Sequence, residues 1–141
     1  MLKDLVEKYY FDQNYNCAES LLHAANEYYD LKLDEYSMKL VSGYGAGIQT
    51  GNTCGTVLSA VSILSLLFVE TKAHESTDIK PVVQLFLEHF GEALNGSLLC
   101  RDLKEQYFRP EERCIDVVLT ACDVLESTIA EYKNSEKADS N

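Results

Sequence analysis

Apolar residues recur along this chain at intervals of three and four, and no segment shows the strict alternation that is typical of a half-buried β-strand. This spacing places the apolar side chains on one face of successive helices. The predicted helices cover residues 2–10, 17–30, 34–43, 54–70, 78–94 and 110–132, and residues 98–103 are expected to form only a short turn. We therefore predict an all-α fold, a single-domain bundle of about five or six helices.

The segment 54–70 stands out because it carries neither a charge nor a helix breaker from Val57 to Val69. A helix that is apolar nearly all round belongs in the interior of a fold, so we expect this helix at the centre of the bundle. It is shorter than a bilayer-spanning helix and contains three serines, so we do not interpret it as a membrane span.

Polar residues that precede the apolar stripes predict where several helices begin. Asn16, with Glu19 three positions later, forms a variant of the capping box, and Asp34 is a further N-cap candidate. Asn52 or Thr53 is expected to cap the central helix.

The last helix is expected to open at Pro110, because proline is tolerated in a first turn and the two glutamates that follow suit the positive end of the helix dipole. We predict one all-helical, cysteine-containing domain over residues 1–132. The polar residues 133–141 are expected to form a frayed tail.

Acidic residues outnumber basic ones, with 23 Asp and Glu against 12 Lys and Arg and a net charge of −11. The acids are spread along the chain, which argues against nucleic acid or an anionic membrane surface as a partner, since both attract clustered Lys and Arg. The first residues show no apolar core or cleavage site of a secretory signal. We therefore expect a cytoplasmic protein without membrane insertion.

Five cysteines are many for a cytoplasmic chain of this length: Cys17, Cys54, Cys100, Cys114 and Cys122. Their number is odd, and no two form a C-x-x-C motif. In a reducing compartment this usage favours metal, cluster or redox chemistry over a disulfide framework. The alternative is a non-catalytic helical interaction module with reduced core cysteines, because free cysteine is often buried.

The predicted caps place Cys17, Cys54 and Cys114 at or near helix N-termini. Unpaired backbone N–H groups there favour the thiolate, which is the nucleophilic and metal-binding form of cysteine. Cys100 has an arginine beside it in the sequence. Cys122 lies in the middle of an apolar stripe and is interpreted as a core residue.

Glycines concentrate just before Cys54, where five of the seven in the chain occur: Gly43, Gly45, Gly47, Gly51 and Gly55. Glycine permits positive φ and close backbone approach. We expect the last four of these to let the loop backbone approach the sulfurs or a bound cofactor. A nucleotide-binding loop is not expected, because the segment follows a helix and not a strand.

The remaining candidates for chemistry are interpreted as structural. His23, His74 and His89 are expected to have surface or packing roles, since nothing in the sequence places them beside a cysteine. Tyr10 is expected at the edge of the core with its hydroxyl reaching water.

Three motifs together carry a resemblance to a known family. They are Asn-Cys-Ala-Glu-Ser at 16–20, the glycine loop that runs into Cys54 and Gly55, and Gly-Ser-Leu-Leu-Cys-Arg-Asp-Leu at 96–103. With Cys114 they resemble the redox-active protein family named C_GCAxxG_C_C for its cysteines, over about residues 5–130.

The resemblance implies an all-helical domain and assigns the four functional cysteines to Cys17, Cys54, Cys100 and Cys114. The chain departs from the family pattern in one motif. Where the family has Cys-Gly-Ala-x-x-Gly, this sequence has Thr56 in place of the alanine and Ser59 in place of the second glycine.

Four such cysteines could support either of two chemistries. They could exchange as thiols and disulfides for electron or thiol transfer, or they could together bind a soft metal ion or an iron–sulfur cluster. We expect Cys54 to be the central residue and Cys17 its closest partner, with Cys100 and Cys114 closing the site. A redox partner protein is expected, and a homodimer is a further expectation.

Overall fold

The computed structural model describes residues 1–139, and in this range the chain is helical without a β-strand. The predicted all-α class is confirmed. The described residues form seven α-helices: α1 (Lys3–Glu7), α2 (Cys17–Tyr29), α3 (Glu35–Met38), α4 (Gly55–Phe68), α5 (Ile79–Ala93), α6 (Cys100–Tyr107) and α7 (Ile115–Asp139). Short 3₁₀ or π segments supplement them, namely η1 (Lys8–Asp12), η2 (Lys39–Tyr44), η3 (Gly47–Gly51) and η4 (Ala73–Glu75).

The helix count exceeds the predicted five or six because residues 100–107 form α6, where the sequence indicated a short turn. Helix α6 has only one buried residue, Leu103, so an apolar stripe could not reveal it. Ser97 stabilises its start: the hydroxyl donates to Asp102 Oδ2 over 2.8 Å and accepts from the Leu99 N–H over 3.2 Å.

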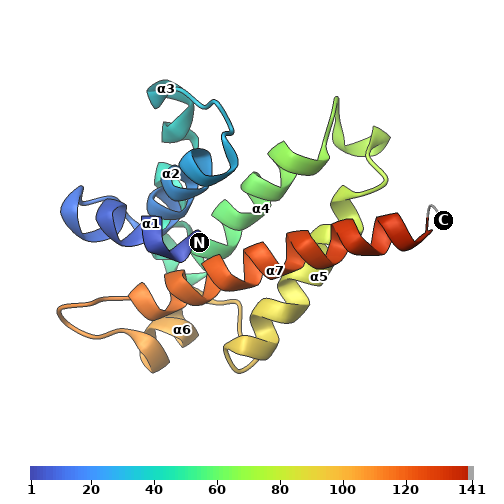
Figure 1. Cartoon of the computed structure of the whole chain (residues 1–141). Helices are drawn as coiled ribbons and strands as arrows, with labels where there is room; N and C mark the ends of the chain where they lie inside the picture. Colours follow the sequence, from blue (N-terminus) through green and yellow to red (C-terminus); the bar gives the residue numbers. More distant parts are fainter. Residues whose placement is uncertain (140–141) are drawn as a thin grey trace.

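Helix α7 runs across the molecule in Figure 1, with α5 beside it and α1 and α2 toward its N-terminal end. It packs against α1, α2, α4, α5 and α6, whereas α4 packs against α2, α5, α7 and η2. The N-terminal half of α4 is buried, but Leu66 in its C-terminal half is 50% exposed. The central position expected for α4 is therefore not confirmed.

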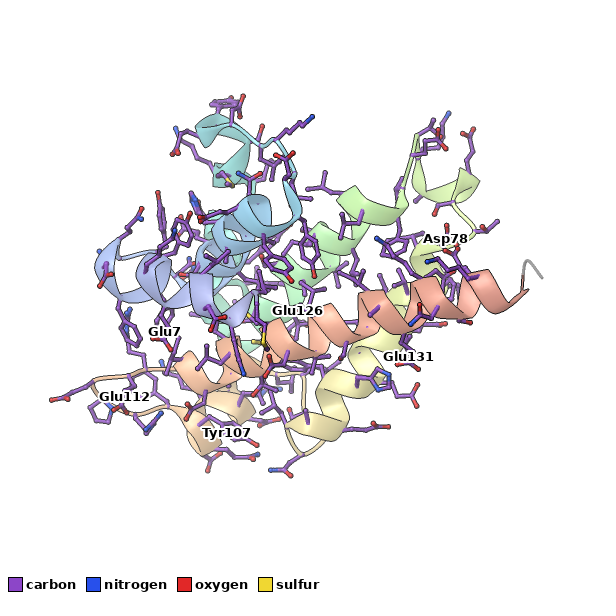
Figure 2. The ribbon with its side chains drawn as sticks, viewed as in Figure 1. Glu7, Asp78, Tyr107, Glu112, Glu126 and Glu131 are labelled. Atoms are coloured by element: carbon purple, nitrogen blue, oxygen red, sulfur yellow. The ribbon has the colours of Figure 1, made fainter. Side chains whose placement is uncertain are left out.

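One continuous apolar core joins these helices. Its largest fully buried side chains include Phe86 and Phe90 of α5, which stack on each other, and Ile63 and Leu64 of α4. At the N-terminus of the chain, the backbone N–H of Leu2 donates a hydrogen bond to Glu126 of α7, which is labelled in Figure 2. This contact holds the N-terminus against α7.

Two predicted caps are confirmed and one is wrong. Asn16 and Glu19 form a complete capping box at α2, and the Asp34 side chain accepts from the Ser37 N–H at α3. At α4 the N-cap residue is Cys54 itself, in place of Asn52 or Thr53.

Two helix boundaries also differ from the prediction. The third helix ends as an α-helix at Met38 and continues as a 3₁₀ helix to Tyr44, so Gly43 does not terminate it. The last helix begins at Ile115 and not at Pro110, because Arg109 and Arg113 pair through two backbone hydrogen bonds and close a turn. Glu112, labelled in Figure 2, lies in this turn and forms an ion pair with Arg109 at 2.9 Å.

Helix α7 continues to Asp139 and so includes residues 133–139 of the predicted polar tail. Residues 140 and 141 of that tail lie outside the described residues, and the division at residue 132 stays a prediction. Among the described residues, no helix combines the length and the apolar character needed to cross a bilayer.

Candidate functional site

Four of the five cysteines lie at the N-termini of four different helices. Cys17 is the first residue of α2 and Cys100 the first residue of α6, while Cys54 is the N-cap of α4. Cys114 directly precedes α7, and its carbonyl accepts from the N–H groups of Val117 and Val118. The sequence predicted this position for three of them, and Cys100 joins them because α6 is a helix.

A short backbone pairing aligns the starts of α4 and α6. Thr53 and Leu99 form an antiparallel bridge, flanked by hydrogen bonds from the Cys54 N–H to Leu98 O at 2.8 Å and from the Cys100 N–H to Asn52 O at 2.7 Å. The N–H groups of both cysteines are therefore bonded across the pairing. It joins two segments that are more than forty residues apart in the sequence.

Asn16 anchors the start of α2 to the segment that leads into the glycine loop. Beyond its capping role, its side-chain amide donates to the Ser42 carbonyl at 3.0 Å. Glu19, its capping-box partner, accepts from the Ser42 hydroxyl at 3.1 Å. The Asn-Cys-Ala-Glu motif thus fixes the position of Cys17 relative to η2.

Two of the four predicted glycines lie directly against cysteines. A Cβ on Gly55 would lie 3.2 Å from Cys17 Sγ and 2.5 Å from the Tyr44 carbonyl oxygen, and one on Gly47 would lie 2.6 Å from Cys100 Cβ. A Cβ on Gly45 would meet the Asn16 side chain, and one on Gly51 would contact Arg101. Close approach of the loop to the cysteines is therefore observed, while binding of a cofactor by these glycines stays a prediction.

The glycine loop also contains a left-handed turn that the sequence did not predict. Ala46, Gly47, Ile48 and Gln49 all have φ between 52° and 61°. A β-branched residue such as Ile48 rarely adopts this conformation, and its side chain is 49% exposed. Backbone strain of this kind concentrates at functional sites, because the surrounding structure must hold it in place.

The four cysteines at helix N-termini are close enough to one another for the charge of one to change the pKa of another. Burial raises the pKa of Cys17 to about 11, and negative charge on Cys54, Cys100 and Cys114 contributes in the same direction. Burial likewise raises the pKa of Cys114 to about 11, with contributions from Cys100 and Cys54. The pKa of Cys100 is raised mainly by burial and to a smaller extent by negative charge on Cys54. We call these four residues the cysteine cluster.

Cys54 is the member of the cysteine cluster whose negative charge would raise the pKa of each of the other three. It is also the most buried of the four, at 6% exposed, whereas the others are partly exposed. The role of Cys54 as the central residue of a redox site stays a prediction.

The expectation that helix N-termini favour the thiolate is wrong for Cys17 and Cys114, and the pKa of Cys100 is raised as well. Their pKa values are raised because burial, together with repulsion between neighbouring thiolates, outweighs the effect of the helix ends. Lys104 and Arg113 oppose this repulsion at Cys114. Cys17, Cys100 and Cys114 are therefore neutral thiols at neutral pH.

The sequence model of the family described as "Putative redox-active protein (C_GCAxxG_C_C)" matches residues 15–128, which is well over half of the chain. The chain belongs to this family. The match includes all four residues of the cysteine cluster. No curated protein and no solved structure matches the chain.

Two residues of the first turns of α4, Thr56 and Ser59, place hydroxyl groups near Cys17 and the residue after it. Ser59 is fully buried in α4, and its hydroxyl donates to the Ala18 carbonyl at 2.7 Å, so it joins α4 to α2 directly after Cys17. Thr56 is also buried, and its hydroxyl has no oxygen or nitrogen partner. Its neighbour is the Cys17 sulfur, whose pKa it lowers.

Tyr10, which precedes the residues matched by the family, was missed by sequence reasoning. It is only 4% exposed, so the prediction that its hydroxyl reaches water is wrong. The hydroxyl accepts from the Cys114 N–H at 3.1 Å, and the Arg113 guanidinium lies 4.3 Å from the ring centroid. No local pattern could have indicated this role, because Cys114 is more than one hundred residues away.

Cys122 lies apart from the cluster, in the buried core as predicted. Burial, and to a smaller extent the charges of Asp123 and Glu126, raise the pKa of Cys122 to about 12. None of the four clustered cysteines contributes to this shift. Histidines contribute to none of the cysteine pKa shifts in the described residues. His23 stacks on Tyr15 at a centroid distance of 4.2 Å, which is a packing role.

The arrangement of the donors does not match a metal centre. Among residues 1–139, no group of three or more His, Cys, Asp or Glu side chains is arranged to hold a metal ion. Binding of a soft metal or an iron–sulfur cluster therefore stays a prediction from the sequence. The five cysteines are all free thiols.

Proposed function

We propose that this protein is a thiol redox protein in which Cys17 and Cys54 exchange with the disulfide of a partner. The observation that carries the proposal is the position of the Cys17 sulfur against the start of α4, where Cys54 is the N-cap: a Cβ on Gly55, the residue after Cys54, would lie 3.2 Å from Cys17 Sγ. Membership of a family described as redox-active supports the same chemistry.

The exchange consists of two thiol–disulfide steps. The Cys17 thiolate attacks one sulfur of a partner disulfide, forms a mixed disulfide and releases the first partner thiolate. Cys54 then attacks the Cys17 sulfur, so that a Cys17–Cys54 disulfide forms and the second partner thiolate leaves. The two protons lost by Cys17 and Cys54 are taken up by the two released partner thiolates. Two electrons have moved from the protein to the partner.

Exposure supports this order of attack. Cys17 is more exposed than Cys54, which is buried and suits the internal second step. Among the neighbouring charges, that of Cys54 contributes most to the raised pKa of Cys17, which favours these two as the reacting pair.

The proposal is tested by counting thiols in protein purified without air. Denatured protein is titrated with a maleimide before and after treatment with glutathione disulfide, and bound metal and the visible spectrum are measured on the same sample. We expect five free thiols, a loss of two on oxidation, full recovery with dithiothreitol, and no stoichiometric metal.

Two other results would contradict the proposal. Stoichiometric metal or a visible absorption band would instead support the metal or iron–sulfur prediction. Five thiols that remain unchanged by glutathione disulfide would support the helical interaction module with reduced core cysteines. The Cys122→Ser variant is the matched control and should lose two of its four thiols in the same way.

A further inference from the structure

We propose that Thr56 is a positioning residue for Cys17: its hydroxyl donates a hydrogen bond to the Cys17 thiolate and so makes Cys17 more reactive toward the partner than burial alone would allow. The inference rests on the proposed function but concerns a separate property, namely how readily the Cys17 sulfur ionises.

The position of Thr56 suits this role. It occupies the first turn of α4, next to Gly55, and the Cys17 sulfur lies against that turn, as the 3.2 Å separation from a Cβ on Gly55 indicates. Thr56 is 1% exposed, so water cannot satisfy its hydroxyl. A threonine hydroxyl in an α-helix often bonds to a backbone carbonyl one turn earlier, but Thr56 has no such turn before it in α4.

The hydroxyl lacks a hydrogen-bond partner while Cys17 is a thiol. Buried hydroxyls without a partner are uncommon and call for an explanation. A thiol is a weak acceptor, but a thiolate accepts charge-assisted hydrogen bonds that are much stronger. The unpaired hydroxyl would therefore gain its partner when Cys17 ionises.

The electrostatics of Cys17 agree with this geometry. Burial and three neighbouring thiols raise the pKa of Cys17, and Thr56 is the group that lowers it. Neither Cys100 nor Cys114 receives a comparable contribution from a hydroxyl group. Among the partly exposed thiols of the cluster, Cys17 alone has a buried donor that stabilises its thiolate.

The test measures the alkylation rate of Cys17 between pH 7 and pH 10 by peptide-resolved mass spectrometry, in reduced protein. Thr56→Val keeps the shape of the side chain but removes the hydroxyl, and we expect Cys17 to react about ten-fold more slowly at pH 8. Thr56→Ser retains the hydroxyl and should react like the natural protein. Thr56→Ala also removes the hydroxyl and should slow Cys17 to the same extent. It replaces Thr56→Val in the test if the valine variant fails to fold.

A purely structural role would give a different result. Because Thr56→Val removes an unpaired buried hydroxyl, its urea midpoint should be equal to or above that of the natural protein. Thr128 of α7 is a second buried hydroxyl without a partner, so Thr128→Val is the matched control and should leave Cys17 unchanged.

An unchanged Cys17 profile in Thr56→Val, or an equal slowing in Thr56→Ser, would overturn the inference. Either result would leave the proposed function standing, provided that the natural protein still loses two thiols on oxidation. Failure of that reversible loss would instead overturn the proposed function, whatever the Cys17 profile shows.

Discussion

Cys54→Ser is expected to end the reversible loss of two thiols and to leave Cys17 trapped as a mixed disulfide. Without the Cys54 thiol, the internal step that releases the partner cannot occur, so treatment with glutathione disulfide should add one glutathione to the protein. Intact-mass spectrometry measures this adduct, and digestion should locate it on Cys17. The natural protein, which completes the internal step, should carry no stable adduct.

Cys122→Ser is the matched substitution outside the cluster. It should leave the thiol exchange intact and lower the free energy of unfolding by roughly 1–3 kcal/mol, because it buries a hydroxyl in place of an apolar thiol at a fully buried position. Urea denaturation measures this cost. If Cys122→Ser abolished the exchange as Cys54→Ser does, the division between cluster and core cysteines would be wrong.

Gly47→Ala is expected to destabilise the protein by about 3 kcal/mol, the sum of backbone strain and overpacking. Gly47 has a φ of +61°, and an added Cβ would lie 2.4 Å from the Asn52 carbonyl oxygen and 2.6 Å from Cys100 Cβ. Relief of these contacts must displace the backbone that pairs with Cys100, so oxidation of the cluster should also slow. Urea denaturation and the rate of thiol loss measure the two effects.

Gly43→Ala serves as the control for this substitution, because a Cβ there has no neighbour within 4 Å and the residue has no positive φ. It should leave the urea midpoint unchanged or raise it slightly, since alanine restricts the unfolded chain. Equal stability of the two variants would show that the left-handed turn is not needed to hold the loop against Cys100.

Features that depend only on residues close together in the sequence were predictable. The capping box of Asn16 and Glu19 and the Asp34 cap each span four residues. Each can therefore be recognised as a short sequence motif. The apolar spacing likewise indicated the longer helices. Helix α6 could not be predicted in this way because Leu103 is its only buried residue and its start depends on the Ser97 side chain.

The site could be predicted only in outline. The position of Cys17 at a helix start follows from the capping box. Cys54 and Cys114 were also expected near helix starts, although the caps predicted for those two helices were wrong, and the contacts that join the cysteines could not be predicted. The Thr53–Leu99 pairing and the hydrogen bond between Tyr10 and Cys114 connect segments far apart in the chain. Burial of the cluster, which reverses the expected direction of the pKa shifts, is likewise a property of the packed fold.

The central claim is that thiols distant in the sequence react as one site, and disulfide mapping tests it most directly. Protein oxidised with glutathione disulfide is alkylated, digested and analysed by mass spectrometry without reduction. The account predicts a peptide that joins Cys17 to Cys54, with Cys122 alkylated in every molecule. A principal linkage that includes Cys122, or linkages only between separate chains, would contradict it.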